Sequence, residues 1–213
     1  MKKNKTDLWL PVGFMLAFIA WTTGVLLLDI QPIGPESSKV GMAALNGWFH
    51  NLTGVRMGLY LWTDWLSLIP LGIIAAFGAV GLRQWIKRKQ LFKVDEDILA
   101  LGVFYILVMA VFCFFEAVVV NYRPVLIGGV LEASYPSSTT MLVLTVMPTA
   151  IMQLRRRIKR PVLNRALVAI SSAYTAFMVL GRLLSGVHWL SDIIGGMLLS
   201  ASLCFAYRAF LKK

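Results

Sequence analysis

The chain has 213 residues, of which 58% are hydrophobic and only 15% are charged, and its mean hydropathy is +0.74. A soluble domain of this length carries more charge, so the composition places the chain among polytopic membrane proteins. The net charge of +11 would also suit a nucleic-acid-binding protein. However, the basic residues stand in short turns between apolar runs, as membrane topology and contact with anionic lipids require. We therefore expect the bilayer, and no nucleic acid, as a partner.

Six apolar runs are each long enough to cross a bilayer at about 1.5 Å per helical residue. In chain order they cover residues 8–30, 57–82, 97–121, 137–154, 162–180 and 188–210. The first run shows no evident small-residue cleavage site, so we expect a spanning helix rather than a cleaved leader. Between the first two runs, residues 41–52 suit a short interfacial helix. The sequence thus predicts an all-α fold in which residues 1–213 form one membrane domain of six helices.

The distribution of Lys and Arg predicts the orientation of this bundle. Only four of the 21 basic residues fall on the face opposite the termini, namely Lys39, Arg56, Arg123 and Arg182. The positive-inside rule then places both termini in the cytoplasm of a plasma-membrane protein. Cys113 and Cys204 lie within apolar runs and lack metal-ligand spacing, so we expect no disulfide framework, metal or cofactor.

The segment Gly181–Asp192, GRLLSGVHWLSD, combines three chemically active side chains in an apolar context. His188 and Asp192 are four residues apart and would share one face of a helix. A histidine can act as a nucleophile while a carboxylate accepts the N–H of its other ring nitrogen. Arg182 adds a group that binds anions. The pattern indicates a site that holds a phosphate and attacks it.

Two further segments reach the same predicted outer face. One is EAVVVNYRP, which ends the third run and carries Arg123; the other is YPSSTT, which opens the fourth run. Ser137 is a natural N-cap there, and the amides at the start of a helix attract anions. The predicted phosphate-binding residues are Arg123, Ser137, Ser138, Thr139 and Arg182.

Three other ionisable residues are candidates for modulating this site. Glu116 precedes Arg123 by two helical turns in the predicted third span and is placed to pair with it. Asp64 lies in the second span, where a carboxylate suggests function or pairing with an arginine. His50 is the second histidine of the chain and would lie on the outer side, either as a proton donor or as an interfacial residue.

These motifs resemble the type 2 phosphatidic acid phosphatase superfamily of integral-membrane lipid phosphatases. The family motifs are Lys-x6-Arg-Pro, Pro-Ser-Gly-His and Ser-Arg-x5-His-x3-Asp. The chain reads Glu116-x6-Arg123-Pro124, Pro136-Ser137-Ser138-Thr139 and Gly181-Arg182-x5-His188-x3-Asp192. The resemblance implies that His188 attacks phosphorus to give a phosphohistidine, which water then hydrolyses. It also implies that Arg123, Arg182, Ser137 and backbone amides hold the phosphate.

The chain departs from the family at three positions. Thr139 replaces the histidine that protonates the leaving group, Glu116 replaces a lysine, and Gly181 replaces a serine. General-acid catalysis is worth about 10²–10⁴-fold, and an alkoxide leaving group needs it more than a phosphate leaving group does. The sequence therefore favours an enzyme that cleaves a polyprenyl diphosphate, such as undecaprenyl diphosphate, at the outer leaflet. The alternatives are a phosphatidylglycerophosphate or phosphatidate phosphatase, and a degenerate homologue that binds or moves lipid phosphate headgroups.

Overall fold

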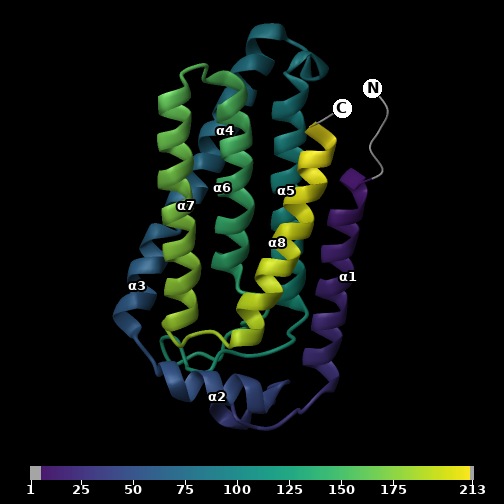
Figure 1. Ribbon diagram of the computed structural model, residues 1–213. Helices are drawn as coiled ribbons and strands as arrows, with labels where there is room; N and C mark the ends of the chain where they lie inside the picture. The colour runs from purple at the N-terminus through teal and green to yellow at the C-terminus, as the bar shows by residue number, and fades with distance from the viewer. Residues whose placement is uncertain (1–5, 212–213) are drawn as a thin grey trace.

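The protein is a bundle of long helices with one short helix lying across an end (Figure 1). The computed structural model describes residues 6–211, with side chains from residue 8 onward. The helices are α1 (Thr6–Leu27), α2 (Ala43–Thr53), α3 (Met57–Leu66), α4 (Leu68–Arg88), α5 (Glu96–Ala117), α6 (Ser138–Arg157), α7 (Pro161–Leu184) and α8 (Leu190–Leu211). Short 3-10 turns occur at Pro35–Ser37 and Leu91–Lys93. Five lysines used in the topology prediction lie outside the described residues: Lys2, Lys3, Lys5, Lys212 and Lys213.

Within residues 6–211, five segments are long and apolar enough to cross a membrane, which makes this a multi-pass membrane protein. They are Leu8–Leu27, Met57–Arg88, Glu96–Ala117, Pro161–Leu184 and Leu190–Leu211. Large apolar side chains such as Trp9 and Ile106 are exposed on them, at 72% and 71%. Exposure on this scale is a liability in water but provides contact with lipid tails in a bilayer.

Helix α6 runs alongside these spans but is more polar, because its side chains face protein rather than lipid. It packs against α7 and α8. Thr145, Thr149 and Gln153 are fully buried on it. Thr145 Oγ1 donates to the Met141 carbonyl at 2.7 Å, and Gln153 Nε2 donates to Tyr207 Oη at 2.5 Å. The helix predicted over residues 137–154 is therefore present, and Thr145, Thr149 and Gln153 are hydrogen-bonded inside the bundle.

Two prolines interrupt helical hydrogen bonding, and other helices satisfy the carbonyl groups that they free. Proline has no N–H to donate to the carbonyl four residues earlier. The Leu66 carbonyl, four residues before Pro70, accepts a hydrogen bond from Tyr174 Oη at 2.9 Å instead. The Leu144 carbonyl, four residues before Pro148, accepts from Cys204 Sγ at 3.2 Å. The predicted helix over 57–82 is thus two helices, α3 and α4, which meet at Ser67.

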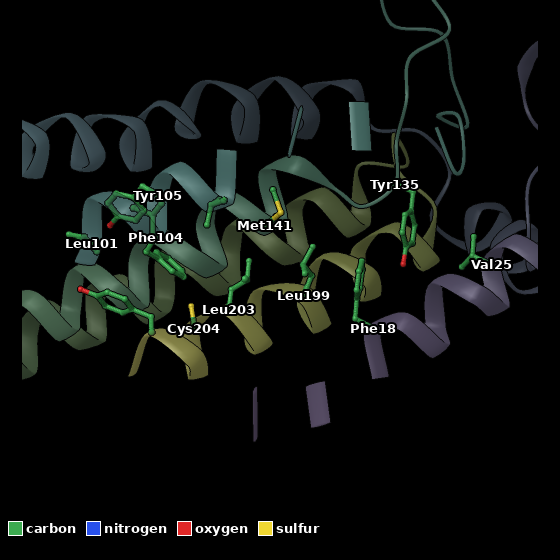
Figure 2. Close-up of a cluster of buried hydrophobic side chains, with 13 residues drawn as sticks. Phe18, Val25, Leu101, Phe104, Tyr105, Tyr135, Met141, Leu199, Leu203 and Cys204 are labelled. Atoms are coloured by element: carbon green, nitrogen blue, oxygen red, sulfur yellow. The ribbon is translucent and has the colours of Figure 1, made fainter. Parts of the chain in front are cut away.

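The hydrophobic core lies where α1, α5, α6 and α8 meet (Figure 2). Phe18 of α1 stacks on Tyr135, with ring centroids 6.4 Å apart. Tyr135 Oη also lies 2.6 Å from Thr22 Oγ1 of the same helix. Because Tyr135 lies two residues before Ser137, the N-cap of α6, these contacts fix where α6 begins.

One end of the bundle gathers the segments that the sequence analysis singled out. Helix α2 covers this end, and the α5–α6 and α7–α8 connections lie there (Figure 1). Helix α5 ends at Ala117, earlier than the predicted 121, and α8 begins at Leu190 rather than at 188. Arg123 and His188 therefore lie on connections between helices, and neither is part of a helix.

Candidate active site

Arg123 and His188 face each other across the two connections. Arg123 Nη1 lies 3.3 Å from His188 Nε2. A guanidinium carries only donors, so this contact requires Nε2 to be the accepting nitrogen and leaves the ring proton on Nδ1. The arrangement presents the lone pair of Nε2 toward a group that binds anions.

A small hairpin in the α5–α6 connection holds Arg123 in this orientation. The backbone N–H of Arg123 donates to the Glu132 carbonyl at 3.0 Å. Arg123 Nε also lies 2.9 Å from Glu132 Oε2. Glu132 was not identified from the sequence, because the hairpin that places it opposite Arg123 lies in an irregular connection. The sequence left open whether Glu116 pairs with Arg123. In the structure α5 ends before Arg123, and Arg123 pairs with Glu132 instead.

His188 and Asp192 are buried beside each other, with exposures of 3% and 0%. His188 Nδ1 lies 3.6 Å from Asp192 Oδ2. This separation is longer than a hydrogen bond, and Oδ2 instead accepts from the backbone N–H of Trp189 at 2.9 Å. Burial lowers the pKa of His188 to about 4, with the Arg123 charge acting in the same direction and Asp192 opposing both. The imidazole is therefore neutral at neutral pH, as a nucleophile must be.

A network of buried side chains holds Asp192 and the start of α8. Asn46 of α2 accepts from the Ser191 N–H at 3.0 Å and donates to Ser191 Oγ at 2.9 Å. Asn121 Nδ2 lies 3.4 Å from Ser191 Oγ and 3.5 Å from Asp192 Oδ1. Asn46 and Asn121 were not identified from the sequence. A possible signal was the presence of an asparagine in each of two otherwise apolar stretches.

Arg182 is almost completely buried, at 1% exposure, near the end of α7. Its Nη2 lies 2.8 Å from Asp64 Oδ1 of α3, and its guanidinium sits over the Tyr60 ring at 4.9 Å. Of the two alternatives for Asp64, a functional role or pairing with an arginine, the structure shows the pairing. A Cβ on Gly181 would lie 2.6 Å from Thr63 Cγ2. A side chain at this position would therefore force Thr63, or α3 as a whole, to shift away from α7.

The start of α6 forms as predicted, with Ser137 as its N-cap. Ser137 Oγ accepts from the Thr140 N–H at 3.5 Å, and the Ser137 N–H donates to the Asp192 carbonyl at 3.1 Å. Thr139 is buried at 9% exposure. The positive end of α6 thus lies beside the segment that carries His188 and Asp192.

A narrow pocket beside His188 lies between α5 and the start of α6. We call it the His188 pocket; its walls include Phe112, Phe115, Glu116, Tyr135, Ser138 and His188. Its free volume is about 10 Å³, close to that of one water-sized sphere. The larger grooves on the bundle are lined mainly by apolar side chains and share no residue with this site. Glu116 is thus brought to His188 rather than to Arg123.

His50 of α2 lies against the residue that follows His188. The ring centroids of His50 and Trp189 are 5.4 Å apart. Burial lowers the pKa of His50, and its Nδ1 has no hydrogen-bond partner among the described residues. Trp189 in turn donates from Nε1 to the Tyr122 carbonyl at 2.7 Å. His50 therefore borders the site through Trp189.

Comparison with known proteins agrees with this geometry. A family model described as the PAP2 superfamily matches residues 122–213, which include Arg123, α6 and the Arg182–Asp192 segment. No curated protein matches the sequence. The fold is similar to the crystal structure of a transmembrane PAP2-type phosphatidylglycerolphosphate phosphatase from Bacillus subtilis, with a TM-score of 0.56 and 19% identity over 96% of each chain. The family model covers 92 of the 213 residues, which is less than half of the chain, and the structural match shows that the fold is shared.

Proposed function

We propose that the chain hydrolyses a lipid phosphate or diphosphate, with His188 as the nucleophile. The observation that carries this proposal is the 3.3 Å approach of Arg123 Nη1 to His188 Nε2. It supports a nucleophilic lone pair on Nε2 and a guanidinium poised to bind the oxygens of the phosphoryl group. Asp192, near Nδ1, stabilises the positive charge that the ring acquires as it attacks.

The reaction has two steps. His188 Nε2 forms a bond to phosphorus while the bond to the leaving oxygen breaks, and that oxygen departs with the electron pair. Water then attacks the phosphohistidine, the N–P bond breaks, and inorganic phosphate is released. Arg123, Arg182 and the amides at the start of α6 neutralise the charge of the phosphoryl oxygens in both steps.

The leading substrate is a polyprenyl diphosphate, of the undecaprenyl diphosphate type. Thr139 stands where a proton-donating histidine is expected, and its hydroxyl is a poor acid. A diphosphate releases a lipid phosphate, which needs less protonation than an alkoxide. A second candidate is a lipid phosphomonoester, because the fold is shared with a phosphatidylglycerolphosphate phosphatase. A third candidate function is binding of lipid headgroups without turnover, which a phosphate-release assay distinguishes from hydrolysis.

The test is phosphate release by the purified protein from a polyprenyl diphosphate in detergent micelles. We expect the wild type to release phosphate and His188→Ala to lose at least about 10³-fold in rate. Binding of the diphosphate by both proteins, with no release by either, would overturn the enzymatic proposal and favour a headgroup-binding protein.

We also propose that this site faces the outside of the plasma membrane, with both termini in the cytoplasm. The test labels single cysteines in intact cells, after replacement of the exposed Cys113. Val130→Cys lies in the α5–α6 connection at 60% exposure, and Lys89→Cys lies at the other end of the bundle. Labelling at residue 130 but not at 89 is expected; the reverse would invert the proposed topology.

A further inference from the structure

Glu116 is a carboxyl group in the wall of the His188 pocket, on the last turn of α5. Glu116 supplies the carboxyl group among the residues that line the pocket. Ser134, Tyr135 and Ser138 also line it, but their hydroxyl groups are far weaker acids. Glu116 is itself an exposed residue. The pocket thus places a carboxylic acid and the nucleophilic histidine in the same small space.

The remaining walls of the pocket suit the lipid side of a substrate. Phe112, Phe115 and Met141 are apolar, and Phe112 and Phe115 come from the same helix as Glu116. A lipid approaching along α5 would place its tail on these aromatic rings and its phosphate ester oxygen near Glu116.

From this juxtaposition we propose that Glu116 is the general acid and base of the reaction. As His188 Nε2 bonds to phosphorus, the leaving oxygen takes the proton of the Glu116 carboxyl group and departs as a neutral alcohol. The free volume of the His188 pocket, about 10 Å³, can hold one water molecule beside Glu116 after the alcohol has departed. The Glu116 carboxylate then accepts a proton from this water as it attacks the phosphohistidine, so the acid is restored at each turnover.

The inference rests on the proposed function and extends its substrate class. With an acid in place, alcohols become usable leaving groups, and the enzyme hydrolyses lipid phosphomonoesters as well as diphosphates. Glu116 would matter most for an alkyl phosphate and least for a diphosphate. A residue that merely shapes the pocket would affect both substrates alike.

The experiment compares kcat/KM for hexadecyl phosphate and for a polyprenyl diphosphate in the same detergent. The value of kcat/KM reports the steps up to departure of the leaving group. Slower hydrolysis of the phosphohistidine therefore does not change kcat/KM. We expect Glu116→Gln to lower kcat/KM about 10²-fold or more for the alkyl phosphate and less than about tenfold for the diphosphate. Glu116→Asp, which keeps the acid, should recover part of the alkyl phosphate activity.

Retained activity on the diphosphate shows that Glu116→Gln is folded. The matched control is Glu96→Gln, at the opposite end of α5, which should leave kcat/KM unchanged for both substrates. Equal losses on both substrates, no loss on either, or a wild type inert toward the alkyl phosphate would each overturn the role of Glu116. These outcomes leave the proposed function standing provided that His188→Ala is inactive on the diphosphate. If the wild type releases phosphate from neither substrate, the proposed function fails first.

Discussion

The two ends of the bundle carry ion pairs of similar length in different surroundings. At the end where α4 meets α5, Arg88 and Asp95 are 2.8 Å apart, with side-chain exposures of 42% and 41%. At the site end, Arg123 and Glu132 are 2.9 Å apart, and Glu132 is again 41% exposed, but Arg123 is only 12% exposed. The carboxylates are equally exposed, so the difference lies in the arginine, which is withdrawn toward His188.

Burial of charge at the site end indicates what this end is for. Isolated buried charges are costly, so they persist where partners compensate for them or where a ligand requires them. Arg182 and Asp192 are buried there, at 1% and 0%. At the other end, Arg88 and Arg157 remain partly exposed beside their acidic partners. The predictions below test this contrast, from the largest expected effect to the smallest.

The largest effect is expected from Asp192→Asn. The substitution removes the charge near His188 Nδ1 and should lower kcat about 10²–10⁴-fold, by analogy with other buried carboxylates that orient a catalytic histidine. The measurement is steady-state phosphate release, with thermal unfolding as the control for folding. Asp97→Asn, which breaks the ion pair with Arg157 at the other end, should leave kcat nearly unchanged. Comparable losses in both variants would remove the contrast between the ends.

The next effect is expected from Gly181→Ser, which restores the residue type of the family motif. The added Cβ would approach Thr63 Cγ2 to 2.6 Å and push α3 away from α7. We expect destabilisation by about 1–3 kcal/mol, together with weaker phosphate binding as Asp64 separates from Arg182. Thermal unfolding in detergent measures the first effect. Gly102→Ser, where a Cβ meets no atom within 4 Å, is the matched control. Unfolding temperatures that match between the two variants would contradict the packing argument.

A smaller effect is expected from Glu132→Gln. Loss of the carboxylate charge loosens the orientation of Arg123, which should raise KM for the lipid substrate about three- to tenfold, because a partly exposed ion pair is worth about 1 kcal/mol. Asp95→Asn removes an equally exposed carboxylate from the other end and should leave KM unchanged. The idea that Glu132 positions Arg123 would be lost if KM changed equally in both variants.

The last prediction concerns the dependence of stability on pH and makes no claim about catalysis. The pKa of His188 is lowered to about 4 in the folded protein, from an ordinary value of 6.5. The unfolded chain therefore takes up a proton first, and stability decreases as the pH falls from about 6.5 toward about 4. The unfolding temperature of the wild type should fall more steeply with decreasing pH than that of His188→Gln. Parallel curves would show that His188 does not titrate in this way.

The sequence predicted the parts of this molecule that depend on local pattern. Apolar runs gave the long helices, and Ser137 before a helical run gave the N-cap of α6. The presence of α6 was predicted although it is more polar than the other spans. The motif residues were predicted at one face, and Arg123, His188 and Asp192 do meet there.

The remaining features depend on contacts between segments that are distant in sequence. Glu132 pairs with Arg123 through a hairpin of irregular backbone, and Asn46 reaches Ser191 across 145 positions of the chain. The helix ends were misplaced near the site, because Gly186 has a φ of +70° and turns the chain before α8 begins. A Cβ there would lie 2.0 Å from the Gly54 carbonyl oxygen, a contact that no local pattern reveals.

The central claim is that His188 carries the phosphoryl group during turnover. The most direct measurement is rapid quenching of the wild type with a polyprenyl diphosphate labelled in its terminal phosphate, followed by denaturing separation of the protein. The account predicts a labelled protein whose phosphate is stable in base and labile in acid, as a phosphohistidine is, and no label in His188→Ala. Phosphate release by the wild type without labelled protein, or equal labelling of His188→Ala, would contradict it.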